Sequence, residues 1–183
     1  MKLLLTTSHK NFFLKNHILE CEELFSLEEA AHMAGHLHEG RDGWRSESFL
    51  KKKLFSRPLS EIASFLFQSD VIRVAFTQVV FPGGPLATSS YQGIVEGLIL
   101  NLGAHDLAPP LPQKIGSGVF ITPDFVFPPS SNTHLLLIVY GGEKLVYVHR
   151  PEDPQLHFLK NLKYQFGDIL KNETHPVLYR KNS

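Results

Sequence analysis

The sequence predicts an α+β fold, in which two or three helices from the first part of the chain pack on one sheet of a β jelly roll. Residues 1–70 contain apolar residues at helical spacing, whereas from residue 71 onward short β-branched and aromatic runs alternate with Gly and Pro. Helices and strands that are segregated along a chain are typical of α+β proteins. We expect the 183 residues to form one domain, with a helical part over 1–70 and jelly-roll strands over 71–183.

Two helices are predicted from their start signals. Ser26 followed by Glu29 has the spacing of a capping box, and the apolar residues after it predict a helix over about 27–38. Ser56 with Pro58 resembles an N-cap followed by proline in the first turn, which predicts a second helix over about 58–68. Three short apolar runs before these helices predict short strands, at 3–5, 12–14 and 18–19.

The remaining elements are predicted as strands that end at Gly or Pro. We expect strands over 71–81, 94–102, 118–121 and 125–127. The run 135–140 is apolar at every position, as in a central strand that is covered on both faces. Gly141-Gly142 predicts a hairpin turn into a strand over 145–148, and Gly167-Asp168 predicts a corner between strands within 163–170.

Composition limits the function classes. Lys plus Arg and Asp plus Glu both total 18, and this zero net charge argues against a dedicated nucleic-acid binder. The longest apolar run is far shorter than a bilayer span, so we expect no membrane partner. Cys21 is the only cysteine, which excludes an internal disulfide and favours a cytoplasmic location. Because glutamates flank Cys21, we do not expect a nucleophilic thiolate there.

The first predicted helix is rich in histidine. His32 and His36 are four residues apart and therefore share a helix face, and His38 follows just beyond. Such a pair can grip a metal ion at two points. The alternative is a polar helix face that happens to be histidine-rich. The basic cluster 51–53 has two interpretations of the same kind, a nucleic-acid contact or a solvated helix face.

Several short motifs, taken together, resemble the iron(II)/2-oxoglutarate-dependent oxygenases, in particular their prolyl-hydroxylase-like and phytanoyl-type members. A helix with a tryptophan after it, a Gly-Gly-Glu turn, a Gly-Asp corner, a histidine and an arginine follow one another in the order seen in that family. A small uncharacterised chlamydial family is similar as well. The residues that carry the resemblance are 27–37, Asp42-Gly43-Trp44, Gly141-Gly142-Glu143, Gly167-Asp168, His175-Pro176-Val177 and Arg180.

The resemblance implies a double-stranded β-helix that holds iron through two histidines and one carboxylate, and 2-oxoglutarate through an arginine. It assigns His175 as the distal histidine and Arg180 as the anchor, although Arg180 follows five residues later rather than the usual ten or so. The family's other two ligands come as His-x-Asp or His-x-Glu, and none of the 10 histidines has that spacing. The expected position, 88–96, contains no histidine. His105-Asp106 is the remaining candidate for a metal-binding pair.

These observations predict an oxygenase-like fold that has lost its metal and 2-oxoglutarate ligands, and that acts as a binding or interaction module without a cofactor. The first alternative is an active oxygenase that uses iron(II) and 2-oxoglutarate, with His105 or Asp106 beside His175 as unusual ligands. The second is a DNA-binding regulator that depends on a divalent cation, supported by His32, His36 and His38 near the basic cluster 51–53. Zero net charge and the lack of a helix-turn-helix pattern count against the second.

Overall fold

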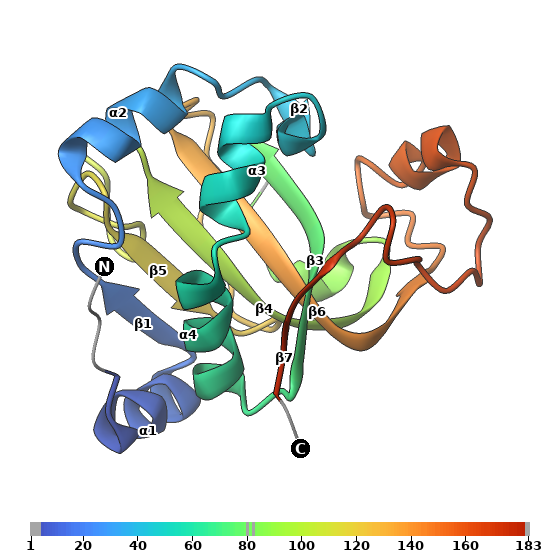
Figure 1. Cartoon of the computed structure of the whole chain (residues 1–183), viewed down its shortest axis with the longest axis horizontal. Helices are drawn as coiled ribbons and strands as arrows, with labels where there is room; N and C mark the ends of the chain where they lie inside the picture. Colours follow the sequence, from blue (N-terminus) through green and yellow to red (C-terminus); the bar gives the residue numbers. More distant parts are fainter. Residues whose placement is uncertain (1–4, 80, 82, 182–183) are drawn as a thin grey trace.

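The computed structural model describes residues 5–79, 81 and 83–181. Its centre is an antiparallel sheet, in which β1, β5, β4, β6, β3 and β2 are neighbours in that order and β7 also pairs with β3 (Figure 1). The strands are β1 (Ile18–Cys21), β2 (Gly40–Arg41), β3 (Val71–Val79), β4 (Tyr91–Asn101), β5 (Gly118–Ile121), β6 (Leu135–Tyr147) and β7 (Val177–Arg180).

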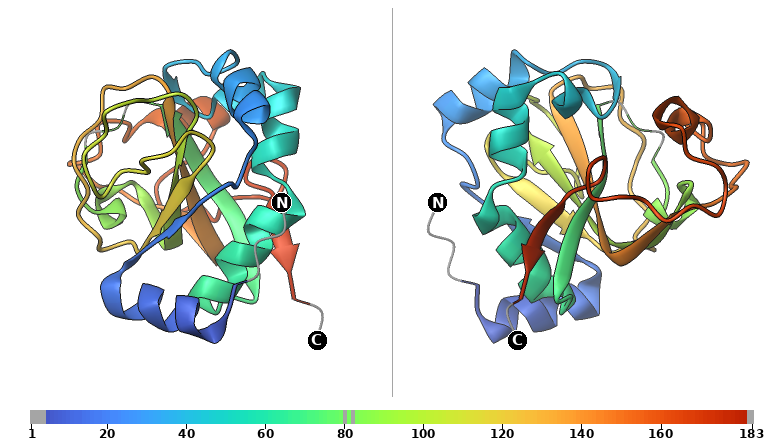
Figure 2. Two further views of the ribbon diagram at one scale, coloured as in Figure 1. Left: turned by 90° about the vertical axis from the view of Figure 1, so that its left-hand side faces the viewer. Right: turned by 45° about the vertical axis from the view of Figure 1, so that its right-hand side comes forward.

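Helices cover one face of this sheet, and long loops cover the other (Figure 2). The α-helices are α1 (Thr7–Asn16), α2 (Leu27–Ala34), α3 (Ser48–Leu54) and α4 (Arg57–Phe67). The short 3-10 helices are η1 (Gly43–Arg45), η2 (Leu86–Thr88) and η3 (Phe158–Leu162). The predicted α+β class, with helices packed on one sheet, is confirmed. None of the described helices is long and apolar enough to cross a bilayer.

The predicted helix starts agree with the structure. The Ser26 hydroxyl accepts a hydrogen bond from the backbone N–H of Glu29 at 3.1 Å, and the Glu29 carboxylate accepts one from the backbone N–H of Ser26 at 3.0 Å. This capping box satisfies two N–H groups that a helix end leaves free. α2 ends at Ala34, four residues before the predicted end, because Gly35 closes it. In α4, Ser56 is the N-cap and proline lies in the first turn, as predicted.

Two strand predictions were wrong. Residues 12–14 belong to α1, where Phe12 and Leu14 are exposed and only Phe13 is buried. The expected hairpin at Gly141-Gly142 does not form, because β6 continues through both glycines, with a register shift against β4 between Gly141 and Val146. A Cβ atom on Gly141 would lie 2.7 Å from the Leu145 side chain, so this glycine permits a close approach within the sheet.

Two other predicted strands are mostly irregular. Residues 125–127 contribute one isolated bridge, from Phe127 to Gly84, and a second bridge joins Phe81 to Ser130. The stretch 163–170 consists mainly of turns, with one bridge to β6. The predicted strand positions 3, 4 and 80 lie outside the described residues.

The sheet separates two hydrophobic cores. Alternate side chains of β4 point to opposite faces, so that Leu98 and Leu100 pack against the helices while Ile99 packs under the loops. Within β6, Ile138 and Tyr140 join the helix-side core and Leu137 joins the loop-side core. The central strands are therefore covered on both faces, as the run 135–140 predicted.

The segment between β6 and β7 stands away from the rest of the molecule. It leaves the end of β6, carries η3 and returns to β7, which pairs with β3 (Figures 1 and 2). Leu159, Tyr164 and Leu170 anchor it in the loop-side core. We call residues 149–172 the projecting segment. Two of its polar groups reach the sheet: the buried carboxylate of Asp153 accepts from Ser90, just before β4, and the carbonyl of Leu170 accepts from Arg73 in β3.

Candidate functional site in the barrel

A cavity of about 240 Å³ lies on the loop-covered side of the sheet. Aromatic and aliphatic side chains from β3, β6 and the connecting loops form most of its wall, and a few polar side chains enter it from the edges. A small, mostly apolar cavity with few polar groups is typical of a small-molecule site. Its lining includes Arg41, Phe76, Gln78, Phe81, Leu86, Ser89, Phe127, Leu137 and Asp153.

A buried ion pair closes one end of this cavity. Arg41 contacts Asp153 at 3.0 Å between Nη2 and Oδ1, and both side chains are almost fully buried, at 3% and 1% exposure. The Arg41 Nε group donates to Gln78 Oε1 at 3.2 Å, and the guanidinium lies 4.2 Å from the centre of the Phe76 ring. These contacts hold the guanidinium in one orientation.

The Asp153 carboxylate also accepts hydrogen bonds from two backbone N–H groups. They belong to Ser90, at 2.7 Å, and to Gln155, at 2.8 Å. Burial alone would raise the pKa of Asp153, but the charge of Arg41 and these N–H donors outweigh that effect and hold the pKa below its usual value. Asp153 therefore carries its negative charge inside the protein.

Behind the cavity lies the only histidine among the described residues that is completely buried, His175, just before β7. Its ring lies between Tyr91 and Tyr164, with ring centres 6.2 and 5.9 Å away. Nδ1 is 2.9 Å from the Thr174 hydroxyl, whereas Nε2 is buried without a hydrogen-bond partner. Tyr91 also packs against Phe76, which lines the cavity, with ring centres 5.1 Å apart.

Two arginines surround His175. Arg73 donates from Nη1 to the carbonyl of His175 at 2.9 Å, and Arg45 donates to the carbonyl of Thr174 at 2.8 Å. Burial, followed by the charges of Arg45 and Arg73, lowers the pKa of His175 to about 3. The imidazole is therefore neutral at any physiological pH.

Only one of the two arginines, Arg45, has an ionic partner among the described residues. Arg45 pairs with the buried Asp42 at 2.8 Å, and Asp42 also accepts hydrogen bonds from Trp44 Nε1 at 3.1 Å and from the backbone of Thr77 at 2.9 Å. Burial raises the pKa of Asp42, and the charge of Arg45 opposes that shift. Arg73 makes no ion pair within the described chain, so the barrel interior carries positive charge.

Comparisons with known proteins identify the fold. No protein family and no curated protein matches the sequence. Among solved structures, the non-heme α-ketoglutarate-dependent epimerase SnoN from nogalamycin biosynthesis is 13% identical, with a TM-score of 0.72, over 95% of this chain and 98% of SnoN. The carbocyclase SnoK from the same biosynthesis, also α-ketoglutarate-dependent, is 14% identical, with a TM-score of 0.72, over 94% and 96%.

A third similar structure, CT296 from Chlamydia trachomatis, is 13% identical, with a TM-score of 0.57, over 77% of this chain and 97% of CT296. This chain has the 2-oxoglutarate-oxygenase-like jelly-roll fold. The fold implied by the sequence resemblance is therefore confirmed, including its likeness to a chlamydial protein. At these identities the comparisons establish fold alone.

The donor atoms around His175 do not fit the iron centre that the fold implies. Within the expected position, 88–96, Tyr91 offers only a phenol to His175. No group of three His, Cys, Asp or Glu residues that could hold a metal ion exists in the part of the chain that the structure describes. The charges nearest to His175 are the guanidinium groups of Arg45 and Arg73, which oppose a divalent cation.

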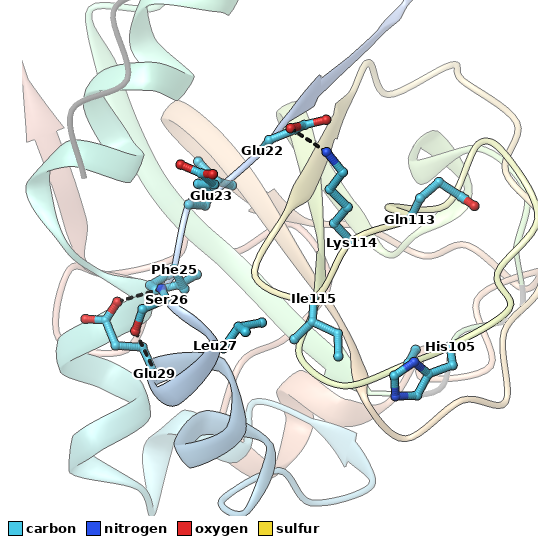
Figure 3. Close-up of a pocket in the computed structure, with 12 residues that line it drawn as sticks. Glu22, Glu23, Phe25, Ser26, Leu27, Glu29, His105, Gln113, Lys114 and Ile115 are labelled. Carbon is cyan, nitrogen blue, oxygen red and sulfur yellow. Dashed lines mark hydrogen bonds and ion pairs between the residues drawn. The ribbon is translucent and has the colours of Figure 1, made fainter.

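The other predicted site residues lie elsewhere. Arg180 is on β7, half exposed, and forms an ion pair with Glu143 at 2.9 Å. His105 and Asp106 are exposed in the loop after β4, and His105 lines a separate surface groove of about 870 Å³ (Figure 3). The structure therefore brings neither Arg180 nor the 105–106 pair together with His175.

That groove lies between the β1–α2 connection and the loop before β5. Glu22 and Lys114 form an ion pair across its rim at 2.8 Å, and Leu27 and Ile115 form its apolar part (Figure 3). Glu29, at its far side, is engaged by the α2 capping box. Two of the groove's acidic side chains, Glu22 and Glu29, thus already have partners within the chain.

The prediction that His32 and His36 share a helix face was wrong, because α2 ends at Ala34 and only His32 lies on it; the three histidines still form a local cluster. The Glu47 carboxylate contacts His36 Nδ1 at 3.1 Å and His38 Nε2 at 3.2 Å. The His32 ring stacks at 4.1 Å from the Phe49 ring. In the basic cluster 51–53, Lys53 pairs with Glu29. These side chains tie α2 to α3.

Sequence reasoning missed the residues that shape the barrel site. Arg41 and Asp153 are 112 positions apart, and neither carries a local signal of its partner. Arg73 did carry a signal, because it is a charged residue inside a strand whose every position is buried. Such an isolated charge in an apolar run indicates a specific interior role.

Proposed function

We propose that this chain is a non-catalytic relative of the 2-oxoglutarate oxygenases, and that its barrel cavity binds a small organic anion instead of iron and 2-oxoglutarate. One observation carries this proposal: His175, which the sequence resemblance assigns as the distal iron ligand, is surrounded by Arg45, Arg73 and the phenol of Tyr91. A divalent cation is attracted by carboxylates and imidazoles, whereas this environment attracts anions.

The cavity itself supports a binding role. Its aromatic and aliphatic wall favours an apolar body, and Arg41 supplies a fixed guanidinium at one end. Guanidinium groups recognise carboxylates and phosphates through paired hydrogen bonds. A ligand with an apolar part and one anionic group would therefore match both ends of the cavity.

The proposal is tested by metal loading and turnover. The purified chain is incubated anaerobically with iron(II) and 2-oxoglutarate, then exposed to oxygen, with SnoK as the positive control. We expect far less than stoichiometric iron by elemental analysis and no succinate above background. Stoichiometric iron together with succinate release would contradict the proposal and support the active-oxygenase alternative.

Anion binding is tested separately by thermal unfolding with a panel of small carboxylic acids and their neutral amides. We expect acids to raise the melting temperature and amides to do so less, because only the acids can use the guanidinium. Equal effects of acids and amides would leave an apolar cavity without anion preference. The DNA-binding alternative gains no support here, because Glu47 already engages His36 and His38.

A further inference from the structure

Arg41 is arranged as a carboxylate receptor. Its position in β2 is opposite Gln78 in β3, which anchors Nε, and the Phe76 ring supports the face of the guanidinium. Both Nη atoms point to the same carboxylate, at 3.0 and 3.4 Å. Because the planar fork is held before any partner arrives, little conformational entropy is lost on binding.

A backbone donor completes this receptor. The N–H of Ser90, immediately before β4, donates at 2.7 Å to the Oδ2 atom of Asp153 that also faces Nη1 of Arg41. Arg41 lies in β2 and Ser90 immediately before β4, and Arg41 is also held by Gln78 and Phe76 of β3, outside the projecting segment. The two donors would therefore remain in place if the carboxylate of Asp153 left.

Asp153, in contrast, belongs to the projecting segment. It lies in a short turn, in which Asp153 N–H donates to the carbonyl of Arg150 at 3.1 Å and Gln155 N–H donates back to the Asp153 side chain. Two backbone bonds join this turn to the residues after it: the Leu156 N–H donates to the carbonyl of Asp153 at 3.0 Å, and the Phe158 N–H donates to the carbonyl of Gln155 at 2.9 Å. The carbonyl of Leu156 in turn contacts the Tyr147 hydroxyl. Release of the turn 150–155 would therefore break these two backbone bonds together with the contacts of the Asp153 carboxylate.

We propose that Asp153 occupies, from within the chain, a site on Arg41 and Ser90 that takes the carboxylate of a small apolar acid, and that exchange between the two carboxylates releases the turn 150–155. The proposal rests on the proposed function and adds its ligand class and its regulation. Arg41 and Asp153 both line the cavity, so a ligand there reaches the same guanidinium. Its apolar part would contact Phe76, Phe81 and Phe127.

Exchange is electrostatically balanced. Removing a partner from a buried ion pair is costly because one charge remains without compensation. Here an incoming carboxylate replaces the outgoing one, so Arg41 stays neutralised, while Asp153 moves from a buried site to water. Displacement by a neutral molecule would leave Arg41 unpaired, so the exchange selects acids over their amides.

The test uses phenylacetate as the probe and phenylacetamide as its neutral match, with dissociation constants measured by titration calorimetry. Asp153→Asn removes the internal competitor, and we expect it to bind phenylacetate at least about tenfold more tightly than the natural chain. Glu152→Gln is the matched control, because Glu152 also lines the cavity and carries the same charge, whereas the ion pair of Arg41 is with Asp153. We expect it to change the affinity by less than about twofold.

Equal or weaker phenylacetate binding by Asp153→Asn would overturn the exchange. An equal gain in both variants would also overturn it, because the effect would then be general charge removal. If phenylacetate binds no variant, the exchange fails, whereas the iron and succinate measurements still decide the non-catalytic role.

A second measurement needs no substitution. In the natural chain, saturating phenylacetate should raise the hydrogen-exchange rates of the Asp153 and Gln155 amides, whose bonds form the turn. Phenylacetamide should not do so. Binding of phenylacetate with unchanged or slower exchange at both amides would refute the release of the turn and leave the binding role intact.

Discussion

Glu96 in β4 lies directly across from Tyr140 in β6, and the side-chain oxygens of both residues are buried without a hydrogen-bond partner. Both side chains face the helix-side core, near Cys21. Burial raises the pKa of Glu96 well above its ordinary value, and the same effect raises the pKa of Tyr140. Glu96 and Tyr140 are therefore held in their neutral forms.

This relationship predicts that Glu96→Gln removes a loss of stability at high pH. Because the folded-state pKa is raised above the unfolded value of about 4.3, the folded chain loses stability as pH rises from that value towards the folded pKa, by up to about 1.4 kcal/mol per pH unit. The glutamine cannot ionise. Urea unfolding should show the variant and the natural chain equally dependent on pH below about pH 4 and the variant increasingly favoured above it.

The control for this experiment is Glu143→Gln, since Glu143 lies in the same strand β6 as Tyr140 but is exposed and pairs with Arg180. It should not flatten the pH profile above about pH 5. Parallel profiles for Glu96→Gln and the natural chain would show that Glu96 is ionised or solvated in the folded state.

His175 predicts the opposite dependence. Its folded pKa of about 3 lies below the unfolded value of about 6.5, so the unfolded chain takes up a proton first. Stability should be complete above about pH 6.5 and fall towards pH 3 by up to about 1.4 kcal/mol per pH unit. The His175→Gln variant should no longer show this fall in stability, whereas His157→Gln, at an exposed position, should still show it. Both are measured by acid titration of unfolding free energies.

Asp42 should be far more important for stability than its single charge suggests. Asp42→Ala leaves Arg45, Trp44 Nε1 and a backbone N–H without their buried acceptor, so we expect a loss of roughly 3–5 kcal/mol in chemical denaturation. The control is Asp70→Ala, because Asp70 is exposed and its ion pair with Lys181 is long, at 3.9 Å. It should change stability little. Similar losses in both variants would contradict the role given to the Asp42 cluster.

Replacing each of the two glycines in β6 by alanine should reduce the stability of the fold by different amounts. Gly141→Ala places a methyl group 2.7 Å from the Leu145 side chain and 3.3 Å from the carbonyl of Gly93, so we expect a loss of roughly 1–3 kcal/mol. Gly142→Ala meets only Val95, at 3.4 Å, and should cost clearly less. Comparable melting temperatures for the two variants would show that the Gly141 environment relaxes easily.

The broad division of the fold could be predicted because local signals agreed with the final structure. Ser26 and Glu29 form the expected capping box, and the uniformly apolar run 135–140 is covered on both faces. The prediction of a hairpin at Gly141-Gly142 was wrong. Gly141 is required there because the Leu145 side chain packs against its backbone, a contact that the local sequence does not reveal. Phe12 and Leu14 suggested a strand although both project from a surface helix.

The candidate site was less predictable because its contacts join distant positions. The resemblance drew attention to His175, but its burial between Tyr91 and Tyr164 follows only from the fold. Cys21 was expected to resist ionisation because of its acidic neighbours; burial is the larger cause and raises its pKa to about 12, with Glu20 adding to the shift. The pairing of Arg41 with Asp153 has no sequence signature.

The strand order also determines how the chain must fold. β1 pairs with β5, which sets Ile18 opposite Ile121, and β3 pairs with β6, which sets Val74 opposite Tyr140. Neither pair can form as a local hairpin, so large loops must close before the central contacts compensate for the lost chain entropy. We expect slow folding, with a transition state organised by β4 and β6 and with β1 joining late at its edge. Until β1 arrives, the outer edge of β5 offers unpaired backbone groups, and a nascent chain would be most prone to misassociation there.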